Sequence, residues 1–342
     1  MVLKKLDEPA LYLNGDDPKT LELLTDINTE QLRQLIGKNK VVFIDEAQRI
    51  PNSGITSKIL VDQFKDVQLL LSGSSAFELN QLMQEPLTGR KWTFRLFPIS
   101  WQEYQANVGF LKAEQTLENF LVFGGYPDVL NHPNDAQEVL QELTDSYLFK
   151  DVLHYANIKK PTLIVKLVQA LAYQMGNEVS YSEIGQLIGL DSKTVSHYID
   201  VLEQAYVVFR LPPFSRNLRN EIKSKPKIYF YDNGIRNAVI GRFEPIKNRN
   251  DAGALWENFL LSERKKHLSY NKLHVNSYFW RTKQQQEVDY VEEINEELFG
   301  FEFKWNPAKA IRFPKTFTDT YHTENLGVSP KNFRAFVMPE MQ

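Results

Sequence analysis

A short apolar run that ends in two acids places the strongest limit on the fold of this chain. Val41 to Ile44 are all apolar, and Asp45 and Glu46 follow directly. A strand that is apolar on both faces is typical of a parallel sheet, because crossover helices cover both faces of such a sheet. In phosphate-handling α/β proteins, acids at such a strand end hold Mg²⁺ and orient a water. The run therefore predicts a parallel sheet with a nucleotide-type site.

The surrounding sequence alternates between strand-like and helix-like segments. The strand-like segments are residues 10–14, 41–45 and 67–75, and the helix-like segments are residues 21–37 and 55–64. Alternation of this kind is the signature of parallel strands that are joined by crossover helices. We expect residues 1–105 to form one such domain.

Composition narrows the class of protein. The chain has 342 residues, which predicts two or three domains. It has no cysteine, so disulfides and thiolate metal sites are excluded. The first residues lack the apolar core of a signal peptide, and no run of about 18 apolar residues could span a membrane. We therefore predict a cytoplasmic protein with no membrane partner.

The motif that would cradle phosphates, G-x-x-x-x-G-K-[ST], does not occur in residues 1–342. Gly37 and Lys38 are followed by Asn39, and no glycine stands five positions before Gly37. Without the backbone N–H groups and the lysine of that motif, ATP binding loses its main electrostatic support. We expect weak or no ATP hydrolysis, and ATP is a doubtful cofactor. In the simpler alternative, Asp45 and Glu46 cap a strand and carry no chemistry.

Four ordered segments resemble a known family. VVFIDEAQRI, LLLSGSS, LTGRKWTFRLFPISWQEY and FGGYPDVL are similar in order and spacing to a prokaryotic family of AAA-type ATPases, with an AAA_14-like domain and a C-terminal DUF4143 domain. The resemblance covers essentially the whole chain. In that family a phosphate loop precedes the segment that matches ALYLNGDD. By this resemblance the chain is either a degenerate or truncated member, or one whose Met start is misplaced or engineered.

The resemblance also implies roles for single residues. Asp45 and Glu46 would be the Walker B acids, with Asp45 as a metal ligand. A serine near the sensor-1 position and an arginine that meets a γ-phosphate or a neighbouring subunit are also implied. The candidates for these two roles are Ser72 or Ser74, and Arg90 or Arg95.

Residues 178–211 predict a helix-turn-helix. A short helix would bury Ile184, Leu187 and Ile188, Gly189 would supply the turn, and a second helix would span residues 192–204. Two strands, YVVFRL and KIYFYD, would then enclose a basic hairpin at residues 212–226, which is the arrangement of a winged helix.

The hairpin and the start of the second helix predict DNA contact. Basic and hydroxyl side chains there suit phosphate and groove contacts, with steep salt dependence. The candidate DNA-binding residues are Lys193, Thr194, His197, Arg216, Arg219, Lys223, Lys225 and Lys227. Asp200 and Glu203 on the same helix would repel DNA, so a surface for a protein partner is the alternative.

Four residues near the C-terminus predict a nuclease-like site. Glu302 and Lys304 stand two apart on a strand, so their side chains share a face. Asp289 on the preceding strand would join Glu302 around one divalent cation such as Mg²⁺, with Lys304 beside the attacking water. Together with Glu257 on a helix, the set resembles the PD-(D/E)XK nuclease fold. Alternating charges on a solvated strand, and competing acids such as Glu287, favour the opposite interpretation.

Residues 106–160 have a helical pattern that FGGYPDVL interrupts. Gly124, Gly125 and Pro127 predict a chain reversal there. The six histidines are scattered without an H-x-x-x-H pair, so a zinc site is not expected.

Taken together, these segments predict an α/β multidomain protein. Its parts are a truncated P-loop-type parallel-sheet domain (1–105), a helical connector (106–160), a winged helix (161–245) and a restriction-endonuclease-like α/β domain (250–342). Three functions fit: a DNA-associated AAA-type protein with an incomplete nucleotide site, a Mg²⁺-dependent nuclease, or a non-enzymatic adaptor for a protein partner. The sequence does not fix the oligomeric state.

Overall fold

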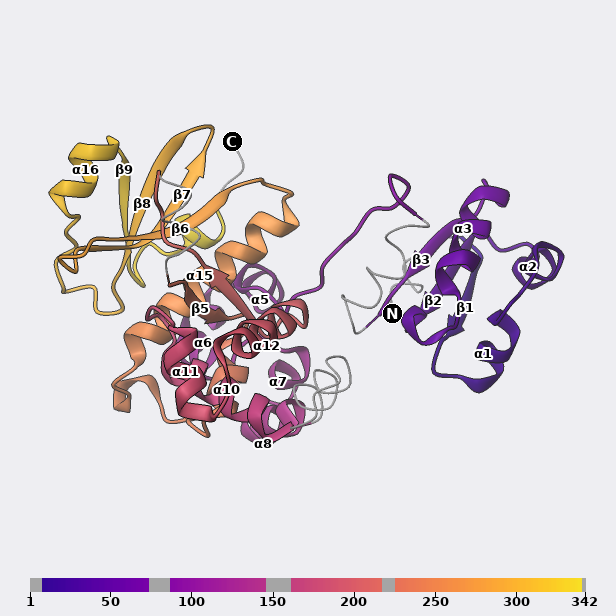
Figure 1. Ribbon diagram of the computed structural model, residues 1–342, viewed down its shortest axis with the longest axis horizontal. Coiled ribbons are helices and arrows are strands. Elements are labelled where there is room, and N and C mark those ends of the chain that lie inside the picture. Colours follow the sequence, from indigo (N-terminus) through magenta and orange to yellow (C-terminus); the bar gives the residue numbers. More distant parts are fainter. Residues whose placement is uncertain (1–7, 74–86, 146–160, 217–224, 340–342) are drawn as a thin grey trace. The chain divides into compact units, whose positions relative to one another are not determined.

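The computed structural model describes residues 8–73, 87–145, 161–216 and 225–339 (Figure 1). The chain divides into two compact units, Met1–Phe94 and Arg95–Gln342. Each unit has a hydrophobic core of its own.

The first unit is built on a three-stranded parallel sheet in the order β1-β2-β3. Its strands are β1 (Ala10–Asn14), β2 (Val41–Asp45) and β3 (Gln68–Leu71). The central strand β2 buries Val42 and Ile44 almost completely. The parallel sheet predicted from the apolar run and from the alternation of segments is confirmed.

Short helices connect these strands. They are α1 (Pro18–Leu24), α2 (Thr29–Ile36), the 3-10 helix η2 (Ala47–Arg49) and α3 (Ser53–Gln63). The helix-like stretch 21–37 is therefore two helices. The second begins at a capping box, in which Asn28 accepts from the Gln31 backbone N–H and the Gln31 side chain accepts in return.

The middle of the second unit is helical. Its helices are α5 (Trp101–Val108), α6 (Phe110–Phe123), α7 (Pro127–Asn131), α8 (Ala136–Leu143), α10 (Pro161–Tyr173), α11 (Tyr181–Ile188), α12 (Ser192–Gln204), α14 (Asn233–Val239) and the 3-10 helix η4 (Ile246–Asn248). An antiparallel pair, β4 (Val208–Leu211) and β5 (Lys227–Phe230), follows α12.

The helix pair α11–α12 matches the predicted boundaries with one error. Gly189 has a φ of +77° and ends α11, and Ile184 and Ile188 are buried as expected. Leu187, however, is 72% exposed, so its predicted burial is wrong. The buried positions of this helix are 184, 185 and 188, so the inward face is centred between them and Leu187 lies beyond its edge.

The C-terminal part joins one long helix to a mixed sheet. Helix α15 (Ala252–Tyr270) precedes four strands in the order β6-β7-β8-β9. The first two pairings are antiparallel and the last is parallel. The strands are β6 (Asn276–Arg281), β7 (Glu287–Ile294), β8 (Glu297–Phe303) and β9 (Glu324–Val328), and two short helices complete this part, α16 (Lys315–Tyr321) and α17 (Arg334–Val337).

One continuous core ties the helical middle to the C-terminal part. Trp101 of α5 packs edge-on against Phe120 of α6 and Phe259 of α15, and Trp256 packs against Phe333. These rings belong to one buried cluster that also contains residues of α10, α12 and β5. Burial of large aromatic rings dominates core energetics, so the second unit is stabilised as a whole.

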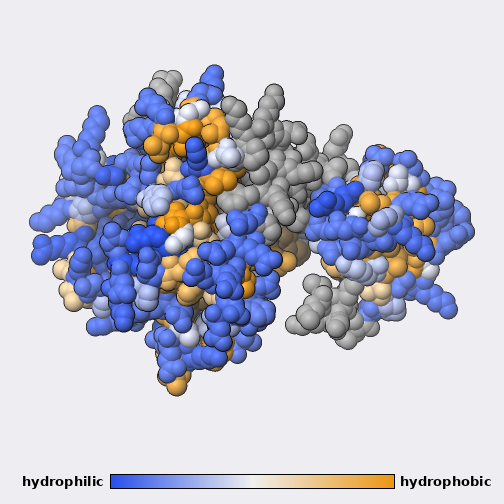
Figure 2. Space-filling view, turned by 90° about the horizontal axis from the view of Figure 1, so that it is seen from below, coloured by the Kyte–Doolittle hydropathy of each residue, from blue (hydrophilic) through white to orange (hydrophobic). Residues whose placement is uncertain are grey.

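The face that Figure 2 shows is largely polar outside its grey part. Figure 2 shows charged and polar residues over most of the visible face, with apolar side chains gathered in a band on the larger unit. Among the described residues, no helix combines the length and the apolar character needed to cross a bilayer.

Candidate functional site

Asp45 lies at the carboxyl end of β2, between two hydroxyl donors from the neighbouring strands. Ser72, just after β3, donates to Asp45 Oδ1, and the Tyr12 hydroxyl of β1 donates to Oδ2 over 2.8 Å. These hydrogen bonds, that from Ser72 above all, lower the pKa of Asp45. The structure thus brings together Asp45 and Ser72, two of the residues implied by the family resemblance. Ser74 lies outside the described residues.

The other candidates of the first unit have different surroundings. Glu46 adopts a left-handed backbone (φ +49°), and its Oε2 accepts from Gln48 Nε2 at 2.5 Å. Arg90 pairs with Asp62 of α3. Arg95 belongs to the second unit, where its guanidinium lies 5.9 Å from the centre of the Tyr206 ring.

The four nuclease-like candidates come together in the second unit. Lys304 Nζ lies 2.9 Å from Glu302 Oε2 and 3.8 Å from Asp289 Oδ2, so Glu302 and Lys304 do share a face. Asp289 Oδ2 also accepts the Phe303 backbone N–H over 2.8 Å, which ties β7 to β8 at this point. Glu257 reaches the same region from α15, close enough for its charge to act on Asp289 and Lys304.

Three more residues lie at this place: sequence reasoning missed Tyr229, assigned Lys227 to DNA contact and counted Glu287 as a competing acid. Strand β5 contributes Lys227 and Tyr229, and β7 contributes Glu287. Lys227 Nζ lies 3.3 Å from Glu257 Oε1 and 2.5 Å from Glu287 Oε1, and the Tyr229 hydroxyl donates to Glu257 Oε1. We call Glu257, Glu287, Asp289 and Glu302 the acid cluster. Within the described ranges, no group of three or more His, Asp or Glu side chains is arranged to hold a metal ion.

Burial controls the protonation of this cluster. Burial and the charge of Asp289 raise the pKa of Glu302 to about 7, although Lys304 opposes the shift. Burial also raises the pKa of Glu257. At neutral pH the acid cluster is therefore not fully ionised, and a bound cation would favour its ionised form.

The buried position of Lys227 corrects one sequence prediction. Its side chain is 2% exposed and lies under the Phe279 ring, so the prediction that Lys227 contacts DNA is wrong. All four residues of β5 are buried, and KIYF is apolar at the other three positions. That apolar context was the available signal that its lysine points inward.

The remaining DNA candidates have mixed environments. Asp191 caps α12, and the Thr194 hydroxyl donates to Asp191 Oδ2 over 2.6 Å, so Thr194 serves the cap. Lys193 and His197 are exposed on the same helix. Lys225 Nζ lies 3.0 Å from Glu183 Oε1. Arg219 and Lys223 lie outside the described residues.

Two acids that were expected to repel DNA are compensated. Asp200 Oδ1 lies 2.7 Å from Arg210 Nη2, and Glu203 pairs with Arg210 Nη1. Arg210 extends from β4, so the hairpin side supplies the charge that balances α12.

The base of the basic hairpin is attached to the C-terminal sheet. The Phe214 N–H donates to the Phe279 carbonyl over 2.6 Å, and the Phe279 N–H donates to Pro212 O over 3.0 Å. The Phe214 ring packs against Tyr321, and the Arg216 guanidinium lies 5.4 Å from the centre of the same Tyr321 ring. Arg216 is thus exposed but held over α16.

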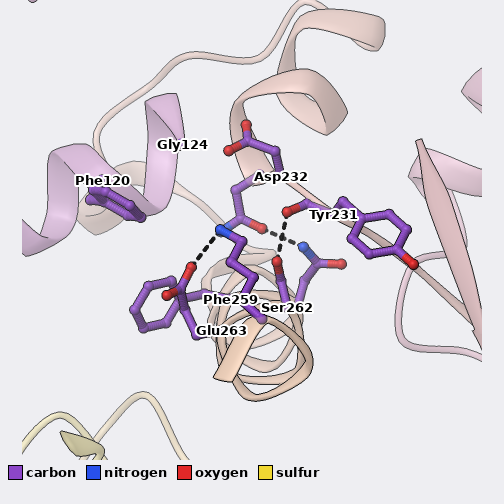
Figure 3. Close-up of a pocket in the computed structure, with 10 residues that line it drawn as sticks. Phe120, Gly124, Tyr231, Asp232, Phe259, Ser262 and Glu263 are labelled. Carbon is purple, nitrogen blue, oxygen red and sulfur yellow. Dashed lines mark hydrogen bonds and ion pairs between the residues drawn. The ribbon is translucent and has the colours of Figure 1, made fainter. Parts of the chain in front are cut away.

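The FGGYPDVL turn meets a buried polar network (Figure 3). The Gly125 N–H donates to Asp232 Oδ2 over 2.8 Å, and Lys266 Nζ lies 2.7 Å from Glu263 Oε1 on α15. The cavity between them, also lined by Gly124, has room for about 10 Å³ of solvent, on the order of one water. This network fixes the turn against α14 and α15, and its cavity is too small for a substrate.

Comparison with known families divides the chain into three parts. Residues 1–105 match an AAA domain, residues 114–246 match a domain of unknown function (DUF8612), and residues 252–338 match another (DUF4143). Together the matches span both units.

The chain is similar to uncharacterized proteins of bacteria and archaea. One from Mycobacterium tuberculosis is 28% identical over 308 residues, which are 89% of this chain and 66% of that protein. One from Haemophilus influenzae is 26% identical over 274 residues, 75% of this chain and 66% of that protein. One from Methanocaldococcus jannaschii is 24% identical over 339 residues, 93% and 74% respectively. The chain thus spans just under two thirds of the length of the first two relatives.

Proposed function

We propose that this chain, in which residues 1–105 match an AAA domain and residues 252–338 match a DUF4143 domain, acts as a DNA-associated AAA-type protein. We further propose that residues 1–342 do not hydrolyse ATP by themselves. The pairing of Asp45 with Ser72 carries the proposal, because it keeps the acid edge of a nucleotide site in a part of the chain that contains no phosphate-loop motif.

Calorimetric titration of residues 1–342 with ATP and Mg²⁺ tests the nucleotide claim. We expect no saturable heat, because an acid and a hydroxyl cannot replace the N–H cradle that holds phosphates. Asp45→Asn is the matched variant. Saturable ATP binding that Asp45→Asn weakens would contradict the claim.

The DNA claim is supported by α12 and by the hairpin base. Lys193 and His197 are exposed at the start of α12, and the acids on that helix are paired with Arg210. Arg216 stands exposed at the hairpin base. Exposed cations of this kind contact phosphates without reading sequence.

Fluorescence anisotropy with a labelled duplex at two salt concentrations tests DNA binding. We expect Lys193→Ala to weaken binding and to reduce the salt slope by about one. Lys247→Ala removes an exposed lysine from η4 and serves as the control. DNA affinity that does not change with salt concentration, or that both variants lower equally, would count against contact through α12.

A second candidate function, Mg²⁺-dependent DNA cleavage, is favoured by the assembly of the four nuclease-like residues. Asp289 and Glu302 would hold the metal, and two carboxylates are enough for Mg²⁺, which keeps several of its waters. The bound ion would supply Lewis-acid polarisation of a phosphate and a more acidic water. Lys304 donates to Glu302 and lies 3.8 Å from Asp289, so it has the charge and the position to contact a phosphate oxygen.

Incubation with supercoiled plasmid and Mn²⁺ or Mg²⁺ tests cleavage. We expect nicking by the wild type, loss of nicking in Glu302→Gln, and unchanged nicking in Glu297→Gln, which alters an exposed acid on the same strand. Equal nicking by Glu302→Gln would identify a contaminant. If neither DNA binding nor nicking occurs, the adaptor function remains as the explanation.

A further inference from the structure

Lys227 is a buried cation inside the acid cluster. Its side chain is 2% exposed, and its ammonium touches Glu257 Oε1 at 3.3 Å and Glu287 Oε1 at 2.5 Å. The Phe279 ring lies 5.2 Å away and covers it with π-electron density. A buried ammonium without partners would be very costly, so these contacts indicate a fixed position.

The two lysines of this region differ in their access to solvent. Lys304, beside Asp289 and Glu302, has a side chain that is 32% exposed, whereas that of Lys227 is 2% exposed. A diffusing cation can therefore displace the ammonium of Lys304 far more easily than that of Lys227. The acid cluster is therefore divided into two pairs: Asp289 and Glu302 lie beside the partly exposed Lys304, whereas Glu257 and Glu287 hold the buried Lys227.

Glu257 of α15 is held in place by side chains from the middle of the chain. Both donors to Glu257 Oε1, Lys227 and Tyr229, come from β5, which belongs to the sheet that follows α12. These two contacts hold Glu257 Oε1 at the pair that Lys227 occupies.

We propose that Lys227 is a positioning residue that takes the place of a second divalent cation, so that the acid cluster accepts one metal ion at Asp289 and Glu302 and none at Glu257 and Glu287. The claim of one metal ion at Asp289 and Glu302 rests on the proposed cleavage function. The claim that Lys227 occupies a cation position does not, because it concerns only Glu257 and Glu287.

Mn²⁺ binding to the full chain, measured by calorimetry and by electron paramagnetic resonance, tests the proposal. The variants are Lys227→Met, Lys227→Gln, the double variant Lys227→Met with Glu257→Gln, and Asp289→Asn. We expect each single Lys227 variant to bind one Mn²⁺ more than the wild type. The double variant loses that additional site, because one of its two carboxylates has become neutral.

The outcomes separate this inference from the proposed cleavage. A wild type that binds no Mn²⁺ refutes the cleavage site, whereas a site gained in Lys227→Met still supports the role of Lys227. A folded Lys227→Met or Lys227→Gln protein that gains no site overturns the role. If a single Lys227 variant is unfolded, Mn²⁺ should restore its helical circular dichroism signal, because Glu257 and Glu287 can then bind the ion. If Mn²⁺ restores the signal of neither single variant, the inference is overturned as well.

Discussion

Replacing Gly124 by alanine should destabilise the second unit through two separate effects. Gly124 has φ +73° and ψ −164°, a backbone region that is essentially restricted to glycine, where another residue costs about 1–3 kcal/mol. An added Cβ would also lie 2.0 Å from Asp232 Oδ1 and 2.4 Å from Oδ2. The buried carboxylate must then move away from the Gly125 N–H, and loss of such a charged hydrogen bond costs about 1.5–3 kcal/mol. We expect a total loss of about 2.5–6 kcal/mol from these two terms.

Gly109 provides the matched control, because it has nearly the same backbone without the neighbour. Its φ is +85° and its ψ is 157°, and nothing lies within 4 Å of an added Cβ. Gly109→Ala should cost only the backbone term, about 1–3 kcal/mol. Calorimetric unfolding of the three proteins measures the difference. Equal losses for Gly124→Ala and Gly109→Ala would refute the claimed contact with Asp232.

Two further predictions concern pH. The pKa of Glu302 is raised to about 7 from its ordinary 4.5 by burial and by Asp289, so its stabilising contribution is complete below about pH 4.5 and is lost as pH rises through 7. The melting temperature of the wild type, measured from pH 5 to 8, should therefore fall relative to that of Glu302→Gln, and parallel curves would contradict this. Although burial opposes it, hydrogen bonds from Arg249 and Arg236 lower the pKa of Asp251 to about 2 from 3.8. Asp251→Asn should therefore lower the melting temperature at pH 6, and the deficit should shrink as pH falls from about 4 to 2. A deficit that does not change with pH would refute the assignment.

Local pattern was enough for much of the fold. The apolar run that ends at Asp45 predicted a buried parallel strand, and the two-residue spacing of Glu302 and Lys304 predicted their shared face. Both inferences depend only on neighbours along the chain and on the period of a strand. The bounds of α12 were also correct, since the helix predicted for residues 192–204 is Ser192–Gln204 in the structure.

The pairing of charged side chains that lie far apart in the chain could not be predicted from the sequence. Lys227 was counted as a surface cation because its partners Glu257 and Glu287 stand 30 and 60 positions further along the chain. The same limit applies to Arg210, whose pairing with Asp200 and Glu203 reverses the expected repulsion on α12. The composition gives the number of cationic side chains but does not identify the acids with which they pair.

The backbone hydrogen bonds that join Pro212 and Phe214 to Phe279 limit where this chain can be recombined with a related one. The family matches place a boundary between residues 246 and 252, yet two backbone hydrogen bonds and the Lys227–Glu257 pair cross it. A crossover at that boundary would leave an inward-pointing lysine on one parental segment and an unmatched acid on the other. A chimaera that exchanges only residues 252–338 for a segment without an acid at position 257 should therefore need a compensating change at position 227.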